Sequence, residues 1–199
     1  MTKLYGKWDT EKIEVKDIGL KKYMNLNPDT PLYNQGTQSK QALGQEKINI
    51  LERLVNALMR SGTGGKISGK LIRSRGGTGK KTKMYKVVEE AMDRIAEKTG
   101  KNPIEILVKA IENAAPREET TRVRYGAVMR HEPVDVSPKR RLDFALRNIG
   151  KSVARKSFKS PKTAAEALEE ELIKASNNDS ESFAVSQKIN VERIAQSSR

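Results

Sequence analysis

The stretch of the chain that most restricts its fold is residues 60–86, where cations and glycine dominate. It holds nine lysines and arginines and no acidic residue, and seven of the chain's 14 glycines fall between positions 62 and 79. A glycine-rich run of one charge sign cannot bury a core, and it repels itself in isolation. We therefore expect a basic loop at 61–83 whose order depends on a bound anion.

On both sides of this loop, apolar residues recur at the spacing of amphipathic helices. We expect helices over residues 45–60, 84–98, 138–158, 161–175 and 184–196, and one that begins at Pro103. Asn102, Ser137 and Ser160 each precede a proline, the order of a capping residue and a first helical position. Glu169–Glu171 form an acidic patch on the predicted helix at 161–175, and we expect it to face solvent or a basic neighbour.

One segment has the pattern of strands. β-Branched and aromatic residues flank Gly126 and Ala127, which predicts a β-hairpin at about 119–136. Residues 1–44 lack periodicity and predict an extended arm, with anchors such as Trp8 and Tyr33, that can order on a partner. The predicted fold is mainly α: a bundle of about six helices over 45–199 with one projecting hairpin and the arm.

The charge of the chain limits its partners. With 39 basic and 25 acidic residues the net charge is +14, which implies nucleic acid or an anionic membrane surface. No apolar run approaches the roughly 20 residues that span a bilayer, and "MTKLYGKWDTEK" has no apolar signal core. We expect an intracellular protein without a membrane partner. Without cysteine, and with His131 as the only histidine, we expect no metal and no cofactor.

The helix at 138–158 is the best candidate for phosphate binding. Leu142, Ala145, Leu146, Ile149 and Val153 share one face of this helix. On the opposite face, a line of four cations is spaced by 7, 4 and 4 residues: Arg140, Arg147, Lys151 and Arg155. A merely solvated face usually mixes charge signs, whereas Asp143 is the one acid in this helix. Arginine suits phosphate because its planar guanidinium donates two hydrogen bonds at once.

Enzyme motifs are incomplete. A nucleotide-binding P-loop needs G-x-x-x-x-G-K-[ST], but Lys81 follows Gly79-Lys80 and Ser74 stands at the first glycine position. Gly65-Lys66 is followed by Ile67 and fails as well. His131 beside Glu132 lacks an orienting group and a nucleophile. We expect neither catalysis nor a small-molecule substrate.

The segment "RVRYGAVMRHEPVDVSPKRRLDFALRNI" resembles the hairpin-to-helix motif of the ribosomal protein S-seven family, the universal small-subunit protein number seven. The shared features are the turn glycine, Pro-Val-acid-Val before the helix, Pro-basic-Arg-Arg at its start and Ala-Leu-Arg within it. The C-terminal "SNNDSESFAVSQKINVERIAQSSR" looks like the archaeal and eukaryotic branch. Gly126-Ala127 and Asn148 differ from the bacterial Gly-Gly and Trp.

The resemblance implies a structural constituent of the small ribosomal subunit in the cytoplasm, of archaeal type and without enzyme activity. Such a protein binds the 3′ major (head) domain of small-subunit RNA and nucleates head assembly. Its hairpin points toward the tRNA exit site and the platform, near the messenger RNA path, and it neighbours ribosomal proteins of the head and platform. A general nucleic-acid or chromatin-type binding protein is the alternative, and a P-loop NTPase is a third interpretation.

We thus predict RNA-binding residues in three groups. The basic loop and its flank supply Lys66, Lys70, Arg73, Arg75, Lys80, Lys81 and Lys83 on composition alone. The resemblance places Arg122, Arg124 and Arg130 on the hairpin, with Tyr125, Gly126, Ala127, Val128 and Met129 at or near its tip. The basic helix supplies Lys139, Arg140, Arg141, Arg147, Lys151, Arg155 and Lys156.

Overall fold

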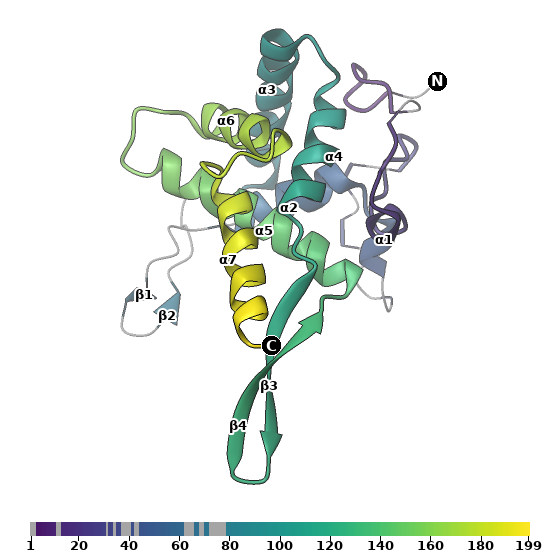
Figure 1. The fold of residues 1–199 in the computed structure, drawn as a ribbon. Helices are drawn as coiled ribbons and strands as arrows, with labels where there is room; N and C mark the ends of the chain where they lie inside the picture. Colours follow the sequence, from purple (N-terminus) through teal and green to yellow (C-terminus); the bar gives the residue numbers. More distant parts are fainter. Residues whose placement is uncertain are drawn as a thin grey trace.

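A computed structural model of the chain describes residues 3–10, 13–30, 32–33, 35–36, 41, 44–61, 66–67, 70–71 and 79–199. Its elements are α1 (Ile18–Lys21), η2 (Gly44–Lys47), α2 (Ile50–Arg60), β1 (Lys66–Ile67), β2 (Lys70–Leu71), α3 (Lys81–Thr99), α4 (Pro103–Ala114), β3 (Glu118–Tyr125), β4 (Val128–Asp135), α5 (Pro138–Ser157), α6 (Ala164–Ser176) and α7 (Phe183–Ser197). The helices pack into a bundle from which one long hairpin projects (Figure 1). The predicted fold class is confirmed.

Several boundaries differ from the prediction for local reasons. The segment 45–60 is a short 3₁₀ turn and then α2, because the Asn49 side chain accepts a hydrogen bond from the Leu51 N–H and caps the helix. Helix α6 begins at Ala164, since Thr163 and Glu166 form a capping box. Ser137 stands at the cap position of α5 without a side-chain cap bond. The short helix α1 and the β1–β2 pair were not predicted from the sequence.

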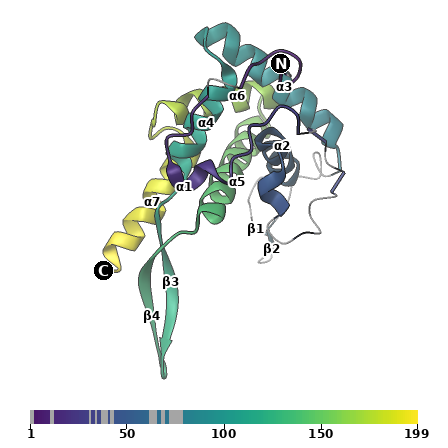
Figure 2. The same cartoon turned by 90° about the vertical axis from the view of Figure 1, so that its right-hand side faces the viewer.

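Helix α6 packs against several other helices of the bundle. It contacts α3, α4, α5 and α7 (Figure 2). Its buried alanines at 165, 167 and 175 keep its contact surface small, so neighbouring helices approach it closely. Leu168 and Leu172 are fully buried among them. The arrangement places α5, the predicted RNA-facing helix, directly against α6.

A fully buried carboxylate joins three of these helices. Glu171 of α6 accepts hydrogen bonds from Ser152 Oγ (2.6 Å) and Lys156 Nζ (2.9 Å) of α5. Its other oxygen accepts from Ser182 Oγ (2.8 Å) and the Ala184 N–H (3.0 Å) at the start of α7. Burial opposes ionisation of Glu171, but these bonds and the Lys156 charge outweigh it, so the pKa of the carboxyl lies below its usual range.

The crossing of α2 and α5 depends on a glycine. A Cβ at Gly150 would lie 3.1 Å from the Ala57 carbonyl oxygen, tighter than side chains normally tolerate. The absence of a side chain thus lets the two helix backbones meet. Arg53 of α2 reinforces the contact with a 2.9 Å bond to Asp143 of α5.

The hairpin of β3 and β4 is a regular antiparallel ladder from Glu118↔Asp135 to Tyr125↔Val128. Its two-residue turn, Gly126 and Ala127, matches the prediction. Gly126 has φ +59, which a glycine at the first turn position adopts without strain. Beyond its base the hairpin leaves the bundle (Figure 1).

Parts of the N-terminal segment lie on the bundle. Leu4, Leu20 and Met24 are buried in the common core, and Trp8 packs against it. Tyr33 is 54% exposed, yet its ring lies 4.5 Å from Lys81 Nζ. Of the two predicted anchors, Trp8 is therefore the more deeply packed.

Replacement of Glu171 by alanine is expected to lower the free energy of unfolding by about 3 kcal/mol. The variant leaves Lys156 without its buried partner and removes the acceptor of the Ser152, Ser182 and Ala184 donors. Urea denaturation at pH 7 measures this change. The matched control is Glu170→Ala, whose carboxylate pairs with Lys162 at the surface and whose loss should change stability little.

The same site predicts a pH dependence. Because the folded pKa of Glu171 is lowered, the carboxylate stabilises the fold above the unfolded pKa of about 4.3 and loses this effect as pH falls through the folded value. The stability difference between wild type and Glu171→Gln should therefore shrink below about pH 4. A difference that stays constant between pH 7 and pH 3 would contradict this assignment.

Candidate RNA interface

Helix α5 carries the core of the candidate interface. The five apolar residues predicted to face inward, from Leu142 to Val153, are all buried. Opposite this seam lies the cationic row, which we define as Arg147, Lys151 and Arg155. Arg147 and Arg155 are exposed, and Lys151 is half-buried between them.

The cationic row is not neutralised by the parts of the chain that the structure describes. No carboxylate there pairs with any of its three members. Burial, followed by the positive charges of Arg147 and Arg155, lowers the pKa of Lys151. A bound anion would relieve this repulsion, so the geometry favours a polyanion along the helix.

Arg140, the fourth cation of the predicted line, takes a different role. Its Nε bonds Glu119 Oε1 of β3 at 2.7 Å, while 65% of its side chain stays exposed. Asp143 does not neutralise the row, because it is bonded to Arg53. Lys139, next to Arg140, is half-buried and has no partner among the described residues.

Three other cations of the predicted set lie in ion pairs within the fold. Arg141 is 11% exposed and bonds Asp17 Oδ2 at 2.5 Å and the Pro116 carbonyl at 3.1 Å. Lys156 bonds the buried Glu171. Lys81 starts α3, inside the segment predicted as a loop, and bonds Glu52 Oε1 at 2.5 Å. The positive charges of these three residues are therefore largely compensated by carboxylates within the fold.

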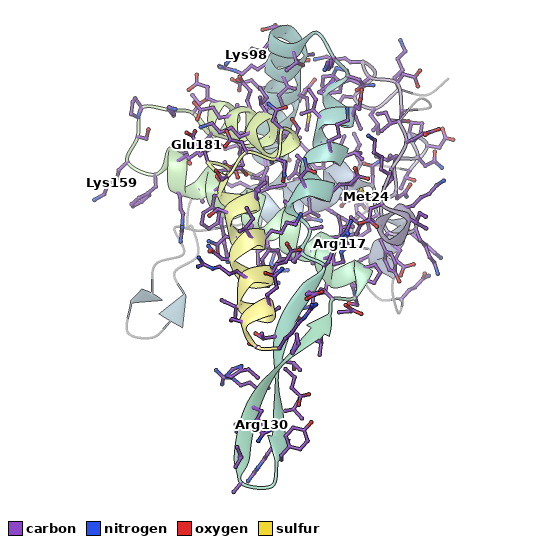
Figure 3. The ribbon with its side chains drawn as sticks, viewed as in Figure 1. Met24, Lys98, Arg117, Arg130, Lys159 and Glu181 are labelled. Atoms are coloured by element: carbon purple, nitrogen blue, oxygen red, sulfur yellow. The ribbon has the colours of Figure 1, made fainter. Side chains whose placement is uncertain are left out.

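The hairpin separates its arginines onto two faces. Arg122 lies opposite His131, and Arg124 opposite Met129, so these four side chains share one face. Arg130 pairs with Val123 and points to the other face, in line with Tyr125 and Val128. Arg124 Nε also bonds the Gly126 carbonyl at the turn (2.8 Å). Figure 3 shows Arg130 far out on the hairpin, beyond the helices.

All the predicted tip residues with large side chains are exposed. Tyr125, Val128 and Met129 are each more than half exposed, and Tyr125 Oη bonds Glu132 Oε1 at 2.8 Å. His131 is exposed as well. The tip thus offers apolar and aromatic surface next to arginines.

The basic loop is the least described part of the predicted site. Lys80 and Lys83 are exposed at the start of α3. The backbone of Lys66 and Lys70 forms part of the β1–β2 pair, but their side chains, and Arg73 and Arg75 as a whole, lie outside the described residues.

Two residues absent from the predicted set, an aromatic residue and a lysine, follow the cationic row at the end of α5. Phe158 is 57% exposed at the end of α5, and Lys159 Nζ lies 5.7 Å from its ring centroid. Arg155 stacks over the Phe183 ring at 4.4 Å. The spacing of 4, 4 and 3 residues from Arg147 to Phe158 was a usable signal, because it continues one helical face.

The acidic patch of α6 faces basic neighbours, as the sequence predicted. Glu169 pairs with Lys98, Glu170 with Lys162 and Glu171 with Lys156. Across the described part of the chain, no cluster of three or more histidine, cysteine or acidic side chains could hold a metal ion. Within the same part, no helix is long and apolar enough to cross a membrane.

The fold and the site define a class: a basic helical bundle with an unneutralised row of cations on one helix and a long projecting hairpin. A family model described as "Ribosomal protein S7p/S5e" matches residues 20–199. The chain belongs to this family.

Among the curated relatives, two align over all or nearly all of the chain. The small ribosomal subunit protein uS7 of Methanococcoides burtonii is 42% identical over 199 residues, covering 100% of both chains. The small ribosomal subunit protein uS7 of Picrophilus torridus is 44% identical over 196 residues, covering 98% of each. The resemblance to the archaeal type of the family is confirmed.

The two neighbouring arginines at the start of α5 are expected to behave differently in limited proteolysis. Arg141→Ala removes the bond between α5 and Asp17, so trypsin should cut faster after Lys16, Lys21 or Lys22. Arg140→Ala, which removes an exposed side chain bonded to the hairpin, should leave these rates unchanged. Mass spectrometry of a digestion time course measures the difference, and equal rates for the two variants would contradict it.

Proposed function

We propose that the chain is a structural constituent of the small ribosomal subunit, in the cytoplasm, that binds the 3′ major domain of its RNA. The observation that carries the proposal is the cationic row on α5 in a member of the S7p/S5e family. Two relatives aligned over nearly the full chain are named as small ribosomal subunit proteins. The net charge of +14 supplies the long-range attraction to RNA.

In the proposed mechanism, α5 lies along folded RNA and its cations displace the counterions condensed on the phosphates. Selectivity comes from the shape of an RNA junction, because the A-form major groove is too deep and narrow for side chains to read. Lys80 and Lys83 and the hairpin arginines add contacts on other sides of the bundle. Binding along several elements at once suits a protein that nucleates assembly of the head.

The hairpin is proposed to reach toward the tRNA exit site and the messenger RNA path, beside proteins of the platform. Its length, its exposed tip and its two differently charged faces support this placement. We infer no catalytic role. The lone His131 is exposed on the hairpin, and the P-loop spacing fails in the sequence.

A direct test compares two polyanions. The protein should bind a fragment of the small-subunit RNA head domain about tenfold or more tightly than duplex DNA of equal length at the same salt. Electrophoretic mobility shift or filter binding measures both dissociation constants. Equal affinities would favour the alternative, a general nucleic-acid or chromatin-type binding protein.

The contribution of the cationic row can be measured separately. Arg147→Ala should reduce the slope of log affinity against log salt by about one unit, because one phosphate contact is lost. The control is Lys109→Ala on α4, a surface lysine that pairs with Glu105 and lies outside the row. An unchanged slope for Arg147→Ala would remove this residue from the phosphate contacts.

A further inference from the structure

Phe158 lies on the same helical face as the cationic row. It is the C-terminal cap residue of α5 and follows Arg155 by three positions. At about 100° per residue, Arg147, Lys151, Arg155 and Phe158 fall within one sector of roughly 80°. The row therefore ends in an exposed aromatic ring.

The backbone after Phe158 turns sharply and holds a cation beside the ring. Lys159 has φ +53, a left-handed backbone conformation that is uncommon for lysine. The chain therefore makes a tight change of direction directly after α5, at what we call the α5 corner (Phe158 and Lys159). Its Nζ lies 5.7 Å from the Phe158 ring centroid. The connection between α5 and α6 carries Lys159 to the outer edge of the molecule (Figure 3).

Two cations close to this corner in sequence are already paired with carboxylates. Lys156 is bonded to Glu171, and Lys162 to Glu170. Lys159, in contrast, has no carboxylate partner in the described part of the chain. Phe158 does not belong to the apolar residues that pack against the core. A cation without a carboxylate partner among the described residues and an exposed ring thus stand together.

We propose that Phe158 stacks on an unpaired base of the small-subunit RNA, at the end of the phosphate track along the cationic row. This inference rests on the proposed function. Unpaired bases in loops and bulges stack on aromatic side chains, and cations beside the ring bind the adjoining phosphates. A protein partner fits less well, because charged residues are depleted at the cores of protein interfaces and lysine is among the depleted residue types.

Three substitutions of Phe158 separate stacking from simple apolar contact. With the head-domain RNA fragment at fixed salt, Phe158→Ala should weaken binding roughly tenfold, within the range seen for single base–aromatic contacts. Phe158→Leu should lose most of this affinity, whereas Phe158→Trp should keep it. Since no charge is lost, the salt slope of all three should match wild type. The control is Ile194→Ala, an α7 side chain of similar exposure at 53%.

A fluorescence measurement reports the contact directly. Trp8 is the one tryptophan of the chain, so Trp8→Phe combined with Phe158→Trp places a single fluorophore at the corner. Stacking on a base should quench its emission as RNA is added. The matched control, Trp8→Phe with Ile194→Trp, should show no such quenching.

The outcomes distinguish this inference from the function on which it rests. If wild type binds the RNA and Phe158→Ala binds equally well, the stacking contact is overturned while the proposed function stands. Full affinity in Phe158→Leu would likewise overturn it, since a leucine has no ring to stack. If wild type itself fails to bind the RNA, both proposals fall. Because Phe158 is exposed, thermal unfolding of the variants should match wild type, which excludes misfolding as a cause.

Discussion

The buried carboxylate of Glu171 is the interaction on which the arrangement of the bundle depends. Four donors from α5 and the start of α7 converge on this one side chain of α6. An ionised group inside the core is tolerable only when it is paired and hydrogen-bonded. These bonds need the correct rotation of α5 about its axis, and that rotation turns the cationic row outward. A core interaction therefore helps to set which face of α5 is exposed to solvent.

The fold sorts its basic residues into two populations. Cations next to buried acids, such as Lys81 at Glu52 and Lys156 at Glu171, hold helices together. Cations without such partners, such as Arg147 and Lys151, repel one another when no anion is bound. The proposed binding surface is therefore smaller than the total charge suggests, and it follows one helix, α5. Because the helix already fixes the backbone of this row, the ordering cost of binding an anion would fall mainly on the side chains.

Local patterns predicted the elements, and long-range partners could not be predicted. The apolar seam of α5, the Asn102 cap with Pro103 and the turn at Gly126 all follow from residues close in sequence. The start of α6 was misplaced because Ser160-Pro161 has a capping pattern. In the structure Thr163 and Glu166 form a capping box through reciprocal side-chain to backbone hydrogen bonds, and this box starts the helix at Ala164. The pairing of Arg141 with Asp17 joins positions 124 residues apart. No periodicity in one sequence reveals such a pair, so the structural cations looked like binding cations.

A second set of ion pairs explains how a two-stranded hairpin can project in a defined direction. An isolated hairpin of this kind is marginally stable in water. Here the base is fixed from two helices: Arg140 of α5 bonds Glu119, and Arg199 after α7 bonds both oxygens of Glu118, at 2.6 and 2.7 Å. The Arg117 N–H also donates to Glu192 of α7. Because every one of these bonds lies at the base, the bundle sets the hairpin's direction, while the outer part of the hairpin extends beyond the helices (Figure 1).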